Sequence, residues 1–135
     1  MDRLRGRAIL VIEDERLIAL DVARSLEEVG CIVIGPVSTV ADAMAKLRNT
    51  AIDAAVLDVN LQAEKSTPVM EALLARRVPF ILVTGYARDA LPEQFQDKPY
   101  LGKPFSHMDL VLTLDGALRS GSGSPLAVST PEPSP

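Results

Sequence analysis

The chain has 135 residues and a net charge of −4, which suits one domain and argues against the basic surface that non-specific nucleic-acid binding needs. Hydrophobic residues make up 47% of the sequence and aromatic residues only 4%, so we expect an aliphatic core. Cys31 is the single cysteine, which excludes an intrachain disulfide. We find neither a signal peptide nor the run of about 20 apolar residues that spans a membrane, and we therefore expect a cytoplasmic protein without membrane insertion.

The first predicted elements are an arm, a strand and a helix. Residues 1–6 form a short N-terminal arm, and the basic cluster Arg3, Arg5 and Arg7 is expected to be solvated rather than to bind a partner. The apolar run Ala8 to Ile12 predicts a buried strand. Apolar residues then recur at helical spacing from Ile18 to Val29, and Gly30 stands where the C-terminal cap of that helix belongs.

The alternation of apolar runs and helical patterns continues along the chain. Further strands are predicted at Cys31 to Ile34, Ala54 to Leu57, Phe80 to Val83 and, more weakly, Tyr100-Leu101. Helices are predicted at Ala41 to Leu47, Thr67 to Arg77, briefly at Pro92 to Phe95, and at Ser106 to Ser120 behind a capping box of Ser106 and Asp109. We expect one doubly wound α/β domain over residues 7–120, with five parallel strands, and a disordered Gly/Ser/Pro-rich tail over residues 121–135.

Polar residues follow four of the predicted strands, at the edge where such sheets bind ligands. They are Glu13 and Asp14, Asp58, Thr84 with Gly85, and Lys103. One acid after a strand is usually a turn or capping residue, but the whole set at one edge is hard to explain by capping. Clustered carboxylates need a cation, and oxygen ligands suit Mg²⁺. With an ammonium and a hydroxyl nearby, the set is suited to forming an acyl phosphate on Asp58, which Gly85 leaves open to approach.

Four motifs, in this order and spacing, resemble the receiver domain of two-component response regulators over about Arg7 to Arg119. They are Val11-Ile12-Glu13-Asp14-Glu15, Leu57-Asp58-Val59-Asn60, Val83-Thr84-Gly85-Tyr86 and Lys103-Pro104-Phe105. The resemblance implies a flavodoxin-like (βα)5 receiver fold with strand order 2-1-3-4-5. It also implies that the chain is no enzyme beyond its own phosphorylation and autodephosphorylation.

The resemblance further implies a role for each residue of the set. Asp58 would be the phosphoacceptor, and it would hold Mg²⁺ or Mn²⁺ together with Asp14, with Glu13 through water, and with the backbone carbonyl of Asn60. Lys103 would pair with the phosphoryl group and precede a cis bond to Pro104. Thr84 would be the switch hydroxyl, and Tyr100 the aromatic that rotates inward when Thr84 moves. Gly85 and Tyr86 would govern access to the phosphate site, although Tyr86 equally fits a plain surface aromatic.

The sequence leaves several functions open. A receiver would take its phosphoryl group from a sensor histidine kinase or a histidine phosphotransfer protein, and would signal through a downstream protein or a phosphorelay. Homodimerisation through the fourth and fifth helices is left open, and so is a role as a phosphate sink. A partial similarity to single-domain alphaproteobacterial receivers with a Phe-Ala-Thr-Gly motif implies a kinase of the HWE/HisKA2 type; Leu82-Val83 replaces Phe-Ala here. The enzyme alternative is a haloacid-dehalogenase-like phosphatase, which needs an acid where this chain has Asn60.

Overall fold

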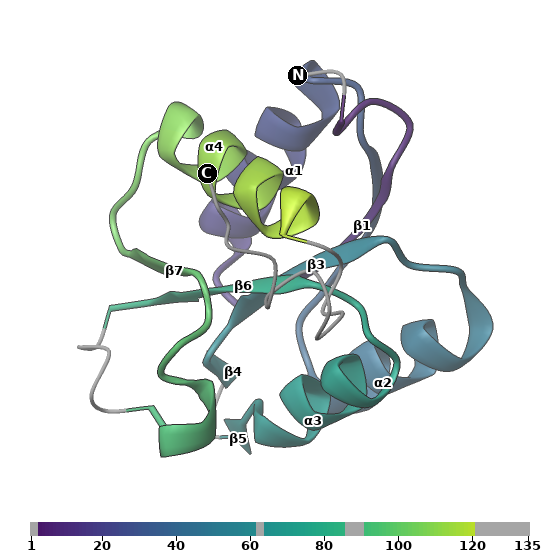
Figure 1. The fold of residues 1–135 in the computed structure, drawn as a ribbon, viewed down its shortest axis with the longest axis vertical. Helices are drawn as coiled ribbons and strands as arrows, with labels where there is room; N and C mark the ends of the chain where they lie inside the picture. The colour runs from purple at the N-terminus through teal and green to yellow at the C-terminus, as the bar shows by residue number, and fades with distance from the viewer. Residues whose placement is uncertain (1–2, 62–63, 86–90, 121–135) are drawn as a thin grey trace.

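The computed structural model describes residues 3–61, 64–85 and 91–120, and a parallel sheet forms its middle layer (Figure 1). The strand order is β2-β1-β3-β6-β7. The strands are β1 (Ala8–Ile12), β2 (Ile32–Val37), β3 (Ala54–Asp58), β6 (Phe80–Thr84) and β7 (Tyr100–Gly102). Counted within this sheet alone, the order is 2-1-3-4-5, so the predicted doubly wound fold is confirmed.

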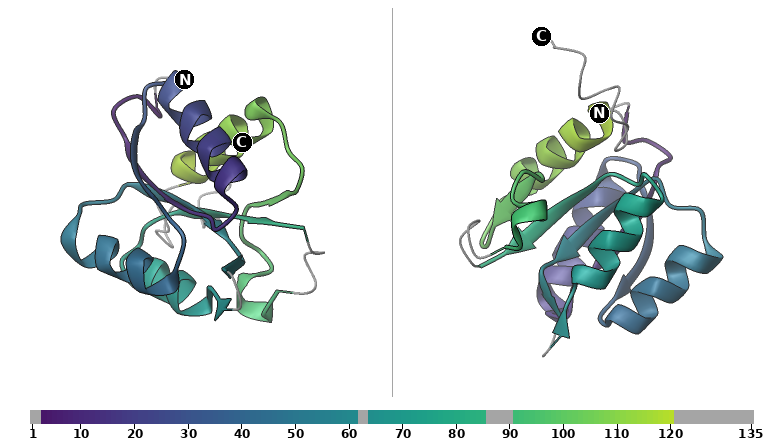
Figure 2. Two further views of the ribbon diagram at one scale, coloured as in Figure 1. Left: turned by 180° about the vertical axis from the view of Figure 1, so that it is seen from behind. Right: turned by 60° about the horizontal axis from the view of Figure 1, so that its bottom comes forward.

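Four helices cover the two faces of the sheet, two on each side (Figures 1 and 2). The helices α1 (Arg16–Glu28) and α4 (His107–Arg119) pack together on one face. The helices α2 (Val40–Asn49) and α3 (Thr67–Ala75) pack together on the other. The predicted helix ends hold at two places: Ser106 and Asp109 form the capping box of α4, and Gly30 follows α1 with a φ of 92°.

The sheet separates two hydrophobic cores, which explains the continuous apolar runs of the sequence. In β1, Ile9 and Val11 belong to the core under α1 and α4, whereas Leu10 and Ile12 belong to the core under α2 and α3. Because both faces of the strand are covered, every position is apolar rather than every second one. The apolar residues of β1 end at Ile12, and the polar residues Glu13 and Asp14 follow directly at the carboxyl end of the strand.

Four of the described elements, β2, η2, β4 and β5, differ from the prediction. The strand β2 extends to Val37 through Gly35-Pro36, which are joined by a cis bond, and its pairing with β1 is irregular there. The expected short helix is a single 3-10 turn, η2 (Glu93–Phe95), which buries Phe95 completely. An unpredicted antiparallel pair, β4 (Asn60–Leu61) with β5 (Glu64–Lys65), follows β3.

The N-terminal arm packs on the domain, and Arg3, although exposed as predicted, forms an ion pair that the sequence did not indicate. Arg3 Nη1 lies 3.0 Å from both carboxylate oxygens of Asp115 on α4. Leu4 is fully buried in the core under α1 and α4, and the amide of Gly6 donates to the Gly30 carbonyl at 2.8 Å. Arg5 and Arg7 are exposed, as expected.

Two predictions fall on residues outside the described part of the chain: the tail over residues 121–135 and the role of Tyr86. Among the described helices, none combines the length and the apolar character needed to cross a membrane.

Candidate functional site

Three carboxylates meet at the carboxyl edge of the sheet because β1 and β3 are neighbours. Glu13 and Asp14 follow β1, and Asp58 ends β3. Each offers one oxygen atom to a group in which all atoms lie within 4.8 Å of one another. Glu13 and Asp58 are buried, at 5% and 6% exposure, while Asp14 is half-buried. The structure therefore brings together the acids that the sequence placed at the strand ends.

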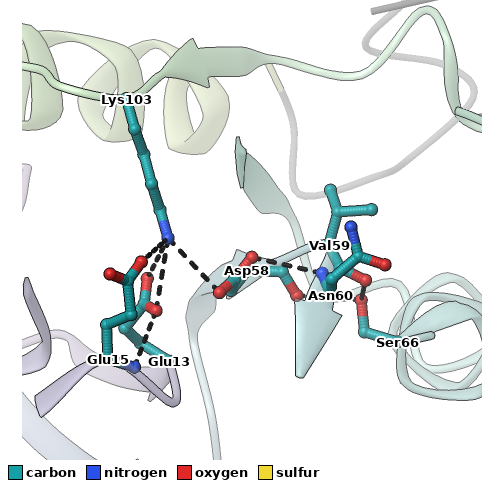
Figure 3. A network of polar contacts seen from close by, with 7 residues as sticks. All are labelled: Glu13, Glu15, Asp58, Val59, Asn60, Ser66 and Lys103. Atoms are coloured by element: carbon teal, nitrogen blue, oxygen red, sulfur yellow. Dashed lines mark hydrogen bonds and ion pairs between the residues drawn. The ribbon is translucent and has the colours of Figure 1, made fainter. Parts of the chain in front are cut away.

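Lys103 reaches this cluster from the end of β7 (Figure 3). Its ammonium nitrogen lies 3.3 Å from Asp58 Oδ2 and 3.2 Å from Glu13 Oε1. The backbone amide of Lys103 donates to the Thr84 carbonyl at 2.9 Å, which anchors it to β6. The bond from Lys103 to Pro104 is cis, as the resemblance implied.

Glu15 is a further contact of Lys103 that the sequence reasoning did not assign. Its carboxylate lies 2.9 Å from the ammonium nitrogen, although the Glu15 side chain is 61% exposed. The available signal was its place in the acidic motif directly after Glu13 and Asp14. An acid one residue beyond a strand-end pair is common on protein surfaces, so the motif alone did not identify the contact.

The electrostatics of the cluster are those of a cation site. Burial, and after it the neighbouring Glu13, raise the pKa of Asp58 from 3.8 to about 7 against the opposing effects of Lys103 and the Asn60 amide. Burial alone would lower the pKa of Lys103, but its contacts with Glu15, Asp58 and Glu13 outweigh this and raise that pKa. Lys103 therefore stays charged, yet one ammonium does not balance the carboxylates around it.

This donor set fits a small, hard divalent cation. Carboxylate oxygens from Glu13, Asp14 and Asp58 are the ligand type that Mg²⁺ and Mn²⁺ prefer. A bound cation would favour the charged form of Asp58, which burial and Glu13 disfavour. Asn60 begins β4 two residues after Asp58, and its backbone amide donates to Asp58 Oδ1 at 3.1 Å.

The hydroxyl residue expected at the site lies on β6, which neighbours β3, and the aromatic residue lies on β7, the strand beyond β6. Thr84 ends β6, which pairs with β3, and its side chain is buried. Gly85 follows it, and a Cβ atom at that position would meet nothing within 4 Å, so the space beside it is open. Tyr100 pairs with Leu82 across β6 and β7, and its half-buried ring packs against the core under α2 and α3.

Ser66 also contacts the site, through the backbone of the segment that follows Asp58. It is fully buried between β5 and α3, and its hydroxyl donates to the carbonyls of Asp58 and Val59 (Figure 3). The sequence reasoning missed it because a serine before Thr67-Pro68 fits an ordinary helix start.

Comparisons with known proteins agree with the geometry. The family model of the response regulator receiver domain matches residues 9–115. Transcriptional regulatory protein PdtaR of Mycobacterium tuberculosis is 28% identical over 116 residues, which cover 83% of this chain and 57% of PdtaR. The chain thus spans little more than half the length of that relative.

Solved structures resemble the chain over most of its length. The solution structure of SdrG from Sphingomonas melonis Fr1 has 45% sequence identity and a TM-score of 0.75, and covers 87% of this chain and 98% of SdrG. SdrG from Pseudomonas melonis Fr1 in its BeF3-activated conformation has 47% identity and a TM-score of 0.71, with 82% and 94% covered. A response regulator receiver protein from Sinorhizobium medicae has 27% identity and a TM-score of 0.72, with 85% and 96% covered.

Proposed function

This chain belongs to the response regulator receiver domain family, and on that premise we propose that Asp58 is the residue that becomes phosphorylated. The chain functions as a phosphorylation-dependent response regulator. One observation carries the assignment to Asp58: its buried carboxylate lies at the carboxyl edge of the sheet between Glu13, Asp14 and the ammonium of Lys103.

The proposed reaction is an in-line phosphoryl transfer to a carboxylate. An oxygen of Asp58 forms a bond to phosphorus while the bond from phosphorus to the donor's histidine nitrogen breaks, and that nitrogen keeps the electron pair. Lys103 pairs with the new phosphoryl oxygens and gives up part of its contact with Asp58 and Glu13 to do so. Asp14, Asp58, the Asn60 carbonyl and, through water, Glu13 would hold Mg²⁺ or Mn²⁺, which would supply positive charge for the phosphoryl oxygens.

The proposed response to phosphorylation begins at Thr84. Its hydroxyl moves to a phosphoryl oxygen, and Tyr100 rotates into the space that this movement leaves. Tyr100 lies on β7, so the change reaches the face formed by η2, β7 and α4. That face is the proposed site of downstream protein binding or of homodimerisation. Gly85 keeps the approach to Asp58 open, and a covering role for Tyr86 stays a prediction.

Membership in the family implies a histidine kinase or a histidine phosphotransfer protein as the phosphodonor. We further propose a kinase of the HWE/HisKA2 type, because Pro79-Phe80 and Thr84-Gly85-Tyr86 partly match single-domain receivers with a Phe-Ala-Thr-Gly motif, with Leu82-Val83 in place of Phe-Ala. A phosphate sink would use the same site chemistry without a downstream partner. The phosphatase alternative is not favoured, because the amide side chain of Asn60 cannot take or give a proton as the second acid of that mechanism does.

A small-molecule phosphodonor tests the assignment directly. The protein is incubated with acetyl phosphate and Mg²⁺, and its intact mass and peptide masses are measured. We expect one labile phosphoryl adduct on the peptide that contains Asp58, and no adduct in Asp58→Asn or in the presence of EDTA. An adduct that persists in Asp58→Asn, or no adduct in the wild-type chain with Mg²⁺, would overturn the proposal. Steady hydrolysis of phosphomonoesters would instead support the phosphatase.

A further inference from the structure

Ser66 occupies the N-cap position of α3, but its side chain does not cap the helix. A serine at this position usually accepts a hydrogen bond from a backbone amide of the first turn. The Ser66 side chain makes no such bond. The helix begins through the backbone instead, since the amides of Val69 and Met70 donate to the Ser66 carbonyl at 3.0 and 3.1 Å. The hydroxyl is therefore available for a different contact.

That contact is with the two peptide groups after the proposed phosphoacceptor (Figure 3). Ser66 Oγ lies 2.9 Å from the Asp58 carbonyl oxygen and 2.7 Å from the Val59 carbonyl oxygen. The Ser66 backbone amide donates to the Val59 carbonyl as well, at 3.0 Å. A serine hydroxyl carries one proton, so the two carbonyls share it. Because Ser66 is fully buried, water does not compete for these oxygens.

The planarity of the peptide bond links this contact to the Asp58 side chain. The Val59 carbonyl and the Asn60 amide belong to one peptide group, in which the C=O and N–H bonds point in opposite directions. Ser66 holds the oxygen end of this group, and the N–H end donates to Asp58 Oδ1 at 3.1 Å. A rotation of the peptide that breaks one of these contacts moves the other as well.

The peptide group before it is held in the same way. The Asp58 carbonyl accepts from Ser66 Oγ, and the Val59 amide at the other end of that group donates to the Val83 carbonyl of β6 at 3.2 Å. Both peptide planes that flank Val59 are thus fixed between Ser66 on one side and the sheet or the Asp58 carboxylate on the other.

We propose that Ser66 is a positioning residue for the phosphorylation of Asp58. Its hydroxyl orients the Val59–Asn60 peptide so that the Asn60 amide holds Oδ1 and leaves Oδ2 facing Lys103, 3.3 Å away. A nucleophile held in one orientation reaches the phosphorus atom without a search among rotamers, which lowers the barrier. This inference rests on the proposed function, because it assumes that Asp58 is the phosphoacceptor.

The test compares Ser66→Ala and Ser66→Cys with the matched control Thr39→Ala in the full chain. Thr39→Ala also removes one side-chain hydroxyl contact, because Thr39 caps α2 by accepting from the Asp42 amide at 3.0 Å. With acetyl phosphate and Mg²⁺, we expect Ser66→Ala to be phosphorylated about tenfold more slowly, the effect of losing roughly one hydrogen bond in the transition state. Thr39→Ala should keep the wild-type rate. Ser66→Cys should fall between, because a thiol has similar shape but donates weakly.

A spectroscopic readout separates positioning from a general loss of stability. In ¹⁵N-edited NMR spectra without Mg²⁺, the Asn60 amide proton should move upfield in Ser66→Ala, as its bond to Asp58 weakens, and should stay in place in Thr39→Ala. If Ser66→Ala fails to fold, Ser66→Cys carries the same two measurements.

A wild-type rate in the Ser66 variants, an unshifted Asn60 amide, or an equal slowing in Thr39→Ala would overturn the inference while the proposed function stands. Undiminished phosphorylation of Asp58→Asn would instead overturn the proposed function.

Discussion

Replacing Asp58 with asparagine should stabilise the metal-free protein at neutral and alkaline pH. The pKa of Asp58 is raised from 3.8 to about 7, first by burial and then by Glu13, so the folded protein binds a proton that the unfolded chain has already released. The stability that the protonated carboxyl contributes is fully present below pH 3.8 and is lost as the pH rises through about 7. Asparagine has nearly the same shape and no charge, so it should not show this loss.

The size of the effect follows from the shift. The difference between about 7 and 3.8 is some three pKa units, and at about 1.36 kcal/mol per unit the whole shift corresponds to about 4 kcal/mol. This shift is already net of the opposing effects of Lys103 and the Asn60 amide, which stabilise the charged carboxylate. We therefore expect Asp58→Asn to gain up to about 4 kcal/mol at pH 8 and close to nothing at pH 4.

Urea unfolding in EDTA at pH 4, 6 and 8 measures the difference between the two proteins. The exposed Asp21 provides a matched control, since Asp21→Asn removes the same charge from the surface of α1. Its effect on the free energy of unfolding should be small at every pH. If Asp58→Asn is no more stable than the wild type at pH 8 in EDTA, the reasoning about a buried, uncompensated carboxylate is wrong. Saturating Mg²⁺ should narrow or reverse the gap, because only the wild type keeps the full ligand set.

Three further predictions concern the cation, the cluster and the arm. Mg²⁺ at 100 times its dissociation constant should raise the free energy of unfolding of the wild type by about 2.7 kcal/mol, read as a rise in Tm that EDTA abolishes; an unchanged Tm would contradict a cation site. Lys103→Ala should slow phosphorylation by acetyl phosphate about tenfold or more. Glu15→Gln should change the rate less than about fivefold, because Glu15 is largely exposed; if it slows the reaction as much as Lys103→Ala, the expectation from the exposure of Glu15 is wrong. Arg3→Ala should lower the free energy of unfolding by about 1–2 kcal/mol in urea. The variant leaves Asp115, whose side chain is 11% exposed, with only the more distant Arg119 at 3.8 Å as an ion-pair partner among the described contacts; an unchanged free energy would mean that the ion pair of Arg3 does not stabilise the packed arm.

The sheet and the acid cluster follow from local patterns that the sequence displays openly. Runs such as Ala8 to Ile12 mark strands covered on both sides, and the parallel arrangement then brings Asp58 beside Glu13 and Asp14 without any knowledge of side-chain contacts. The register of the parallel strands places these acids at one edge of the sheet, and this register depends on the strands and not on the loops.

The missed features depend on contacts between distant residues or on very short elements. Leu4 is an isolated apolar residue between Arg3 and Arg5, and its burial is accompanied by an ion pair between Arg3 and Asp115, which are far apart in the sequence. The pair β4 and β5 has two residues in each strand, too few for a periodic pattern. Ser66 has the sequence of a helix cap, and only the structure shows that its hydroxyl points to the backbone after Asp58 instead.

The two outer strands of the sheet limit how copies of this chain can associate. An open strand edge can add a strand from another molecule, and this leads to aggregation when the edge is long and regular. The edge strand β7 has three residues, and the edge strand β2 carries Pro36, which has no amide proton to donate. Neither edge of the described sheet therefore offers a continuous ladder to a second copy. Self-association of this receiver is therefore expected to use side chains, such as those of the proposed η2, β7 and α4 face, which can respond to phosphorylation, rather than the backbone hydrogen bonds of a shared sheet.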